Sequence, residues 1–257
     1  IEPRYFILIM FILLLSFTAL VTATLSGVFG MAGGMLLMGV YVALLPVPTA
    51  MVMHGGTQLI SNVSRAWLLR GHVYWRGFVY YVAGSSVAFA LMLGLHYTPD
   101  PLVVFLGLGL TPFIARLLPA EWLDFQRPRA ALVTGFQVAA VQLMAGAAGP
   151  LLDIAFVDTQ LDRNQVVATK AVTQVFSHSL KLLYFGAAVQ LGELSAPLVA
   201  AIVLATLAGT RLGTAVLARL SDVAFKRYSR AIVLAIGAMY LFKAASLWLG
   251  ASGALGG

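Results

Sequence analysis

Long uninterrupted apolar segments dominate this chain of 257 residues. A helix that crosses the hydrocarbon core of a bilayer needs about 20 predominantly apolar residues, whereas the strands of an outer-membrane barrel alternate apolar and polar residues over about ten positions. The sequence therefore predicts an all-α polytopic membrane protein with about eight long transmembrane helices. The segments that predict them are residues 5–26, 48–69, 77–96, 102–118, 130–147, 163–186, 196–218 and 231–249.

The scarcity of charge agrees with a membrane location. Only 10% of the residues are charged, compared with about 25% in soluble domains. The net charge of +7 would also suit a nucleic-acid partner, but most of the basic residues lie in loops between apolar segments, as the positive-inside rule predicts. A secretory signal cleaved after Ala23 is the weaker reading of residues 5–26, because that stretch exceeds a usual signal core. We expect a multi-pass protein of the bacterial cytoplasmic (inner) membrane that contacts lipid and no nucleic acid, with homo-oligomerisation left open.

An internal repeat divides the chain into two halves. At an offset of 116 residues, two glycine-rich breaks align, and a Thr-Gln-x-x-Ser-x-x-x-(Arg/Lys) string follows each break in the same register. The alignment predicts two homologous transmembrane repeats, residues 1–120 and 121–257, within one integrated transport domain. The short apolar pieces 34–46 and 149–161 follow the breaks, and we expect them to form half-helices because they are too short to cross alone.

The basic loops bear on topology. Arg70, Arg76 and Arg127 lie in loops that should face the cytoplasm. With eight crossings alone, the basic run 219–230 would face the opposite side. If each half-helix also counts as a segment, each repeat contains five, the repeats become inverted, and the basic run returns to the cytoplasm. We favour the inverted arrangement.

The glycine breaks are the first candidate anion site. Irregular backbone at membrane depth is tolerated only where it is buried in protein or lines a wet cavity, and the start of the following helix favours negative charge. The alternative is that the glycines only let helices pack closely. Their occurrence in repeat register favours a binding site formed by Gly30, Gly33, Gly34, Gly146 and Gly149.

Two polar helix faces are the second candidate. Residues spaced by three or four positions share a helix face, and one such face occurs in each repeat. The first contains His54, Gln58, Ser61 and Arg65 with Thr57 beside them, and the second contains Lys170, Gln174, Ser177 and Lys181 with Thr173 and His178 beside them. We expect both faces to contribute to substrate binding.

The charges on these faces carry the functional argument. A charge near the bilayer centre costs at least about 2.5–3.5 kcal/mol, and no carboxylate shares a face with Lys170, so we expect an anionic substrate to compensate it. Arg65 and Lys181 lie nearer the helix ends and could equally reach the interface. Asp153 is a candidate for proton coupling or for pairing with Lys170. The two histidines could titrate or simply pack.

Signatures of other chemistry are missing from the sequence. It contains no cysteine, no metal-binding helix motif, no nucleophile elbow and no phosphate-binding lysine loop. We therefore expect no enzyme, no cofactor and no metal, but a secondary transporter whose two repeats give alternating access to a small anion. An anion channel is the main alternative, and a membrane-embedded enzyme is a weaker one.

The breaks and the helices after them resemble those of the TauE/SafE family of sulfite and organosulfonate exporters. The likeness rests on Gly30, Gly33 and Gly34, on their repeat partners Gly146, Gly149 and Pro150, and on the helices 49–70 and 163–186. The resemblance covers nearly the whole chain. It implies transport, usually outward, of a small sulfur-containing anion such as sulfite or sulfoacetate.

Overall fold

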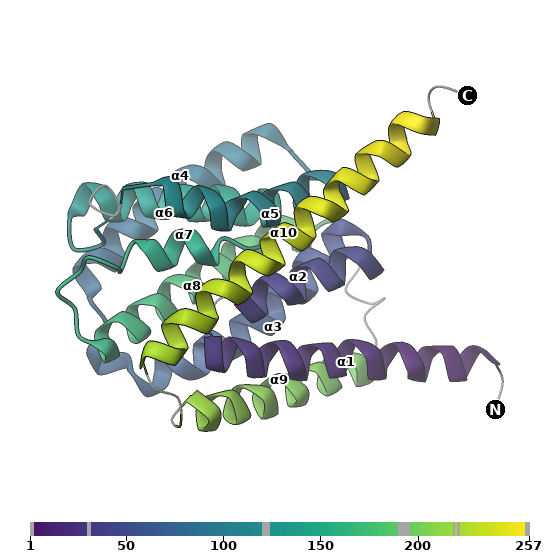
Figure 1. Ribbon diagram of the computed structural model, residues 1–257, viewed down its shortest axis with the longest axis horizontal. Coiled ribbons are helices and arrows are strands. Elements are labelled where there is room, and N and C mark those ends of the chain that lie inside the picture. Colours follow the sequence, from purple (N-terminus) through teal and green to yellow (C-terminus); the bar gives the residue numbers. More distant parts are fainter. Residues whose placement is uncertain are drawn as a thin grey trace.

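A computed structural model describes residues 3–29, 32–119, 124–189, 196–217, 219 and 222–254, and all regular structure in these residues is helical (Figure 1). The eight predicted apolar segments coincide with eight long helices to within several residues at each end, except that the last helix is longer. The elements are α1 (Pro3–Phe29), α2 (Ala32–Leu44), α3 (Val47–Leu68), the short 3-10 helix η1 (Arg70–His72), α4 (Trp75–Leu95), α5 (Pro101–Leu117), α6 (Pro128–Ala145), α7 (Gly149–Ile154), α8 (Arg163–Gly186), α9 (Ala196–Leu217) and α10 (Asp222–Ala254).

Local sequence explains where several helices begin. Proline occupies the first turn of α3, α5, α6 and α7, where its missing N–H costs nothing. The Asp100 carboxylate caps α5 by accepting from Val103 N at 2.9 Å. Asp162 caps α8 in a reciprocal capping box with Gln165. The second half-helix is shorter than predicted: α7 ends at Ile154, and turns occupy most of the predicted stretch that remains.

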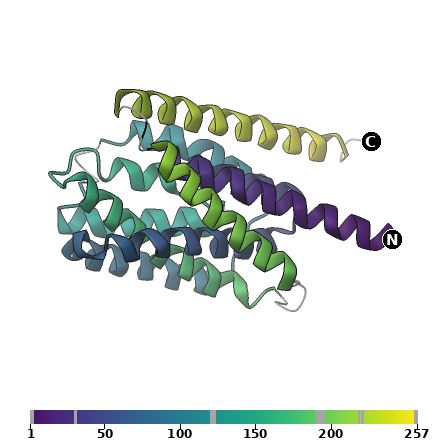
Figure 2. The same ribbon diagram turned by 90° about the horizontal axis from the view of Figure 1, so that it is seen from below.

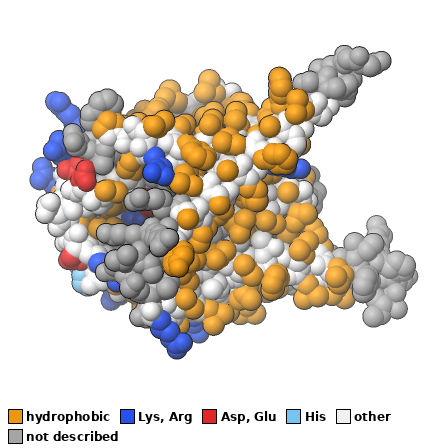
Figure 3. All heavy atoms as spheres, viewed as in Figure 1, with side chains coloured by type: hydrophobic (Ala, Val, Ile, Leu, Met, Phe, Trp, Pro, Cys, Tyr) orange, Lys and Arg blue, Asp and Glu red, His pale blue; other side chains and the backbone are white. Residues whose placement is uncertain are grey.

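Among the described residues, four helices have the length and hydropathy required to cross a membrane. They contain the segments Ile9–Phe29, Trp75–Leu95, Ala196–Val216 and Ala231–Ala251. Apolar side chains cover much of the visible surface, while Lys, Arg, Asp and Glu gather mainly at one end (Figure 3). Such a surface suits a protein embedded in lipid, since an apolar area this large is not left in water. The chain is therefore an integral membrane protein.

The other helices have lower hydropathy or shorter apolar lengths. Helix α5 is apolar but has 17 residues, and α2 has 13. Helices α3 and α8 have sufficient length, but each carries a polar face.

The helices pack in pairs around a central pair. Helix α3 lies against α8, α1 against α9, α4 against α6, and α5 against α10. The ends of α3, α5, α7 and α9 and the starts of α4, α6, α8 and α10 lie toward the same end, on the left of Figure 1, whereas the start of α1 and the end of α10 lie toward the other end. Figure 2 shows α1, α9 and α10 on the outside of the bundle. Helix α2 packs between α1 and α3, so the first glycine break lies beside the central pair.

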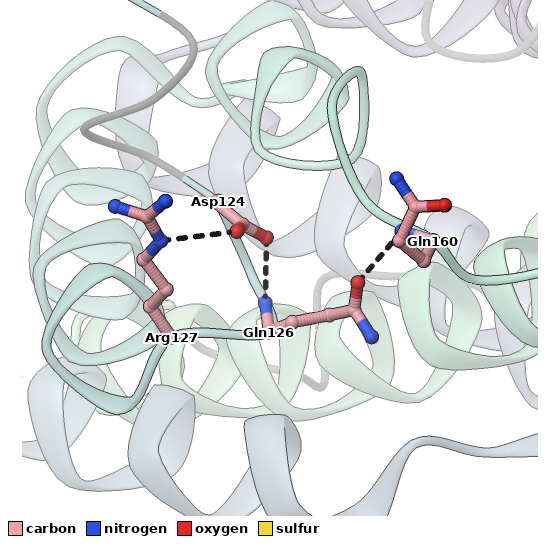
Figure 4. Close-up of polar contacts among 4 residues, drawn as sticks. All are labelled: Asp124, Gln126, Arg127 and Gln160. Atoms are coloured by element: carbon pink, nitrogen blue, oxygen red, sulfur yellow. Dashed lines mark hydrogen bonds and ion pairs between the residues drawn. The ribbon is translucent and has the colours of Figure 1, made fainter.

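The connection before α6 is anchored to the connection after α7. Phe125 is fully buried and stacks on Phe156 with ring centroids 4.6 Å apart, and its backbone N–H donates to Ala155 O at 2.9 Å. In the neighbouring contacts, Gln160 N donates to the Gln126 side chain at 2.6 Å, and an Asp124–Arg127 ion pair spans 3.3 Å (Figure 4). These contacts fix the ends of α6 and α8 relative to each other.

Candidate functional site

The two glycine breaks are buried beside the central helix pair. Helix α6 ends at Gly146, whose φ of +81° lies in the left-handed region that favours glycine. Gly33, Gly34 and Gly149 are also buried. Gly30 lies outside the described residues.

A small pocket with a volume of about 30 Å³ lies between the breaks and the polar faces of α3 and α8. The two glutamines related by the repeat, Gln58 and Gln174, both line it, as do the two histidines. The breaks contribute backbone and small side chains. The lining residues are Ser26, Gly34, Met35, His54, Gln58, Asn62, Arg65, Gln142, Ala147, Ala148, Gly149, Gln174 and His178. None of them is acidic.

Several polar groups of the pocket have no hydrogen-bond partner. Gln174 is 4% exposed and Gln142 is 1% exposed, yet Gln174 Nε2 and Gln142 Oε1 are unpaired among the described residues. The buried Nε of Arg65 is also unpaired there. An unpaired buried polar group costs about 1–3 kcal/mol, so these atoms favour a polar occupant.

The remaining bonds of the pocket hold its side chains in place. Arg65 Nη2 donates to Ser61 Oγ at 2.9 Å, and Ser61 Oγ lies 3.2 Å from Thr210 Oγ1 on α9. On the other side, Gln142 Nε2 lies 3.1 Å from His178 Nδ1. Ser61 thus positions the guanidinium, while Gln142 orients the imidazole.

Lys181 is buried, with no exposed surface. Its Nζ lies 2.6 Å from His54 Nδ1 and donates to Gly146 O at 2.9 Å. The interpretation that Lys181 reaches the membrane interface is therefore wrong, because the closely packed α3 and α8 enclose its side chain. Lys181 does not line the pocket, but it lies within hydrogen-bond distance of His54, which does.

Lys170 does not have the environment that the sequence predicted. It forms an ion pair with Asp153, and the two side chains are 23% and 41% exposed. It is not among the pocket residues. Of the two roles predicted for Asp153, the structure shows the pairing with Lys170. Helical periodicity found no carboxylate on the same helix face, but α7 places this one, 17 positions earlier in the chain, beside α8.

Other predicted residues lie near the pocket without lining it. The hydroxyl of Thr57 donates to Met53 O at 2.8 Å and that of Thr173 to Lys170 O at 2.9 Å, both within their own helices. Ser177 Oγ lies 2.5 Å from the Tyr81 hydroxyl. In this conformation the three hydroxyls are hydrogen-bonded to other protein groups, and none of them lines the pocket.

Sequence reasoning missed several lining residues. The polar faces and glycine breaks predicted from the sequence do not include Asn62, Ser26 or Gln142, which all line the pocket. Ser26 and Gln142 are themselves related by the offset of 116 residues, each lying four positions before a break. Extending the repeat alignment upstream of the breaks would have identified both.

A polar pocket whose described lining holds no acidic residue, inside an apolar helical bundle, is typical of a membrane transporter for small anions. The comparison with protein families gives the particular family. Residues 15–240 match the family model described as "Sulfite exporter TauE/SafE", and the chain belongs to this family of membrane sulfite and anion exporters. The resemblance inferred from the glycine breaks is thereby confirmed. No curated protein and no solved structure matched the chain.

Proposed function

We propose that this protein is a secondary transporter of the bacterial inner membrane that exports sulfite or a sulfonate such as sulfoacetate, and that the anion binds in the pocket between α3 and α8. The observation that carries the proposal is the pairing of basic and amide donors with the lack of any carboxylate in the lining. An acidic group would repel an anion, whereas amide and guanidinium N–H groups bind oxyanions directly.

The donors come from both halves of the chain. Arg65 supplies the charged group, with an N–H still free for a ligand. Gln58 and Asn62 add amides from α3, and Gln174 adds the unpaired buried Nε2 from α8. An anion with three sulfur-bound oxygens could accept from several of these donors at once, so this donor set favours sulfite and sulfonates over a halide.

We also propose that residues 1–120 and 121–257 are inverted repeats that rock against each other. The packing supports this proposal. If the halves are exchanged, the α1–α9 pair becomes α6–α4, while the α3–α8 and α5–α10 pairs map onto themselves, as expected for a two-fold relation. Helices α1 and α6 also start from opposite ends of the molecule (Figure 1). The pocket lies where the halves meet, which is where inverted-repeat transporters bind substrate.

A thermal-shift panel on the purified protein tests the binding step. Sulfite, sulfoacetate, thiosulfate, sulfate and acetate serve as probes, because a ligand of the folded state raises Tm by mass action. We expect sulfite or sulfoacetate to give the largest rise. Gln174→Leu should weaken that binding about two- to tenfold through loss of one hydrogen bond, and Gln137→Leu, outside the pocket, should not.

Counterflow in proteoliposomes tests the transport mechanism. A carrier accelerates uptake of labelled sulfite or sulfoacetate when the lumen holds the unlabelled anion, and its flux saturates. An anion channel gives neither behaviour. The absence of any stabilising anion, together with the absence of flux, would refute the proposal.

A further inference from the structure

Two titratable side chains connect the glycine breaks beside the pocket. His54 on α3 lies with Nε2 2.9 Å from Gly34 O, at the first break. Its Nδ1 lies 2.6 Å from Lys181 Nζ, and Lys181 donates to Gly146 O at the second break. One chain of hydrogen bonds thus runs from one break to the other, and His54 also lines the pocket.

Hydrogen counting shows which protonation states this chain accommodates. A carbonyl oxygen only accepts, so Nε2 of His54 carries a hydrogen and Nδ1 of the neutral ring accepts from Lys181. A neutral lysine amine has two N–H groups, and His54 Nδ1 and Gly146 O receive both. The pair is therefore fully hydrogen-bonded without a net charge. An added proton creates one more N–H, for which no further partner of Lys181 exists among the described residues.

The surroundings of the pair disfavour that proton unless an anion is present. His178 from α8 has its ring centroid 5.5 Å from that of His54, and Arg65 from α3 lines the same pocket. The phenols of Tyr41 on α2 and Tyr81 on α4 are buried, and the Tyr81 hydroxyl lies within hydrogen-bond distance of Ser177 on α8. Helix α6 contributes the neutral amide of Gln142, and α7 contributes the backbone of Gly149. Helix α9 contributes the hydroxyl of Thr210, which lies 3.2 Å from Ser61 Oγ. All of these groups are neutral or basic, so a positive charge here has no compensating carboxylate in the described lining.

We propose that His54 and Lys181 form a proton-binding site that is filled together with the anion, so that one proton is carried with each anion. The proton adds to the nitrogen lone pair left by the neutral pair, and the anion in the pocket compensates the charge. Because binding linkage is reciprocal, the anion strengthens proton binding as much as the proton strengthens anion binding. The proposal rests on the proposed transport function and adds its coupling ion.

The same bonds link the proton to the conformation of the chain. Any rocking of the halves that separates Gly34 O from Gly146 O must break at least one bond of the chain between them. Proton occupancy changes the number of donors in that chain, so it changes the free energy of the separation. Proton binding is then coupled to the movement of the halves, because His54 and Lys181 lie between the two breaks.

Proteoliposomes with a clamped membrane potential provide the test. Sulfoacetate is the main probe, because its own charge does not change around neutral pH as that of sulfite does. With an alkaline lumen and one proton carried per anion, sulfoacetate should accumulate about tenfold per pH unit at equilibrium. Lys181→Met and His54→Gln should abolish this accumulation. Lys181→Arg should also abolish it, because arginine keeps the charge but does not release the proton.

The control is Lys243→Met, which removes an exposed lysine on α10 and should leave the accumulation unchanged. Counterflow by the wild type without any response to pH would overturn this inference and leave the transport proposal standing, whereas no flux at all would overturn both. Full accumulation by Lys181→Met would also overturn it.

A binding measurement on the wild type tests the proton site without relying on the folding of any variant. Calorimetric titration of the wild type with sulfoacetate, in two buffers of different ionisation enthalpy, counts the protons taken up on binding. About one proton per anion is expected, and none would refute the proton site.

Discussion

Arg65 gives the sharpest test of the pocket, because it is the cation that lines it among the described residues. Its Nη2 donates to Ser61 Oγ at 2.9 Å, while its buried Nε has no partner there. Arg65→Gln removes the charge and the fork of donors. A hydrogen bond to a charged group contributes about 1.5–3 kcal/mol, and about 1.4 kcal/mol corresponds to a tenfold change in Kd. We therefore expect sulfite or sulfoacetate to bind about 10- to 100-fold more weakly.

Thermal and chemical unfolding with and without the anion measure this loss. At an anion concentration of 100 times the wild-type Kd, the wild type gains about 2.7 kcal/mol. A variant with a tenfold higher Kd gains only about 1.4 kcal/mol under the same conditions. Without anion, the free energy of unfolding should change by at most about 1 kcal/mol, the contribution of a cation in the last turn of a helix.

Arg70→Gln is the matched control for Arg65→Gln. Arg70 follows the same helix but is exposed and lies over the Trp67 ring, so the substitution removes an equal charge outside the pocket. Its anion affinity should stay within about twofold of the wild type, since screening weakens an exposed charge at a distance. Equal losses in the two variants would refute a direct contact of Arg65 with the anion, as would an unchanged Kd in Arg65→Gln.

Three further substitutions test other parts of the site. Gly146→Ala should destabilise the fold by at least about 1–2 kcal/mol, because φ is +81° and a Cβ would meet Met38; Gly94→Ala, with open space around it, should not lower Tm. Lys170→Met should leave the Kd for sulfite within about twofold, because Lys170 lies outside the pocket, and a tenfold loss would restore it as a ligand. Tyr81→Phe should lower the free energy of unfolding in denaturant by about 1–3 kcal/mol, since it leaves a buried serine hydroxyl without its bond.

The sequence predicts the helices well because the bilayer constrains it so strongly. Apolar runs of about 20 residues leave few alternatives to a helix, and helices α5, α6 and α8 start within two residues of the predicted positions 102, 130 and 163. The second half-helix was predicted less accurately than the first. Apart from Asp153, the piece after the second break is apolar up to Val157, but hydropathy alone does not distinguish a short helix from buried turns, and α7 ends at Ile154.

Helical periodicity does not predict the contact partners of the basic residues. Lys170 and Lys181 share one face of α8, eleven positions apart, yet one pairs with a carboxylate and the other is enclosed between α3 and α8. The face is a property of one helix, whereas the partners come from α7, α3 and the second break. These partners depend on the packing of segments that are distant in the sequence. Helical periodicity therefore predicted Lys170, and not Lys181, as the buried cation.

The low hydropathy of α3 and α8 is explained by the direction in which their polar faces point. Both were predicted as apolar spans, but α3 and α8 are less apolar than the helices outside them, and neither is among the four described helices whose hydropathy and length suffice for a membrane span. Their polar faces, however, meet each other at the pocket, where Gln58 and Gln174 lie. The apolar pairs α1–α9 and α4–α6 flank this centre, so the polar groups contact protein or substrate instead of lipid. A low hydropathy in the central helix of each half is therefore the physical requirement of a polar pocket built inside an apolar bundle.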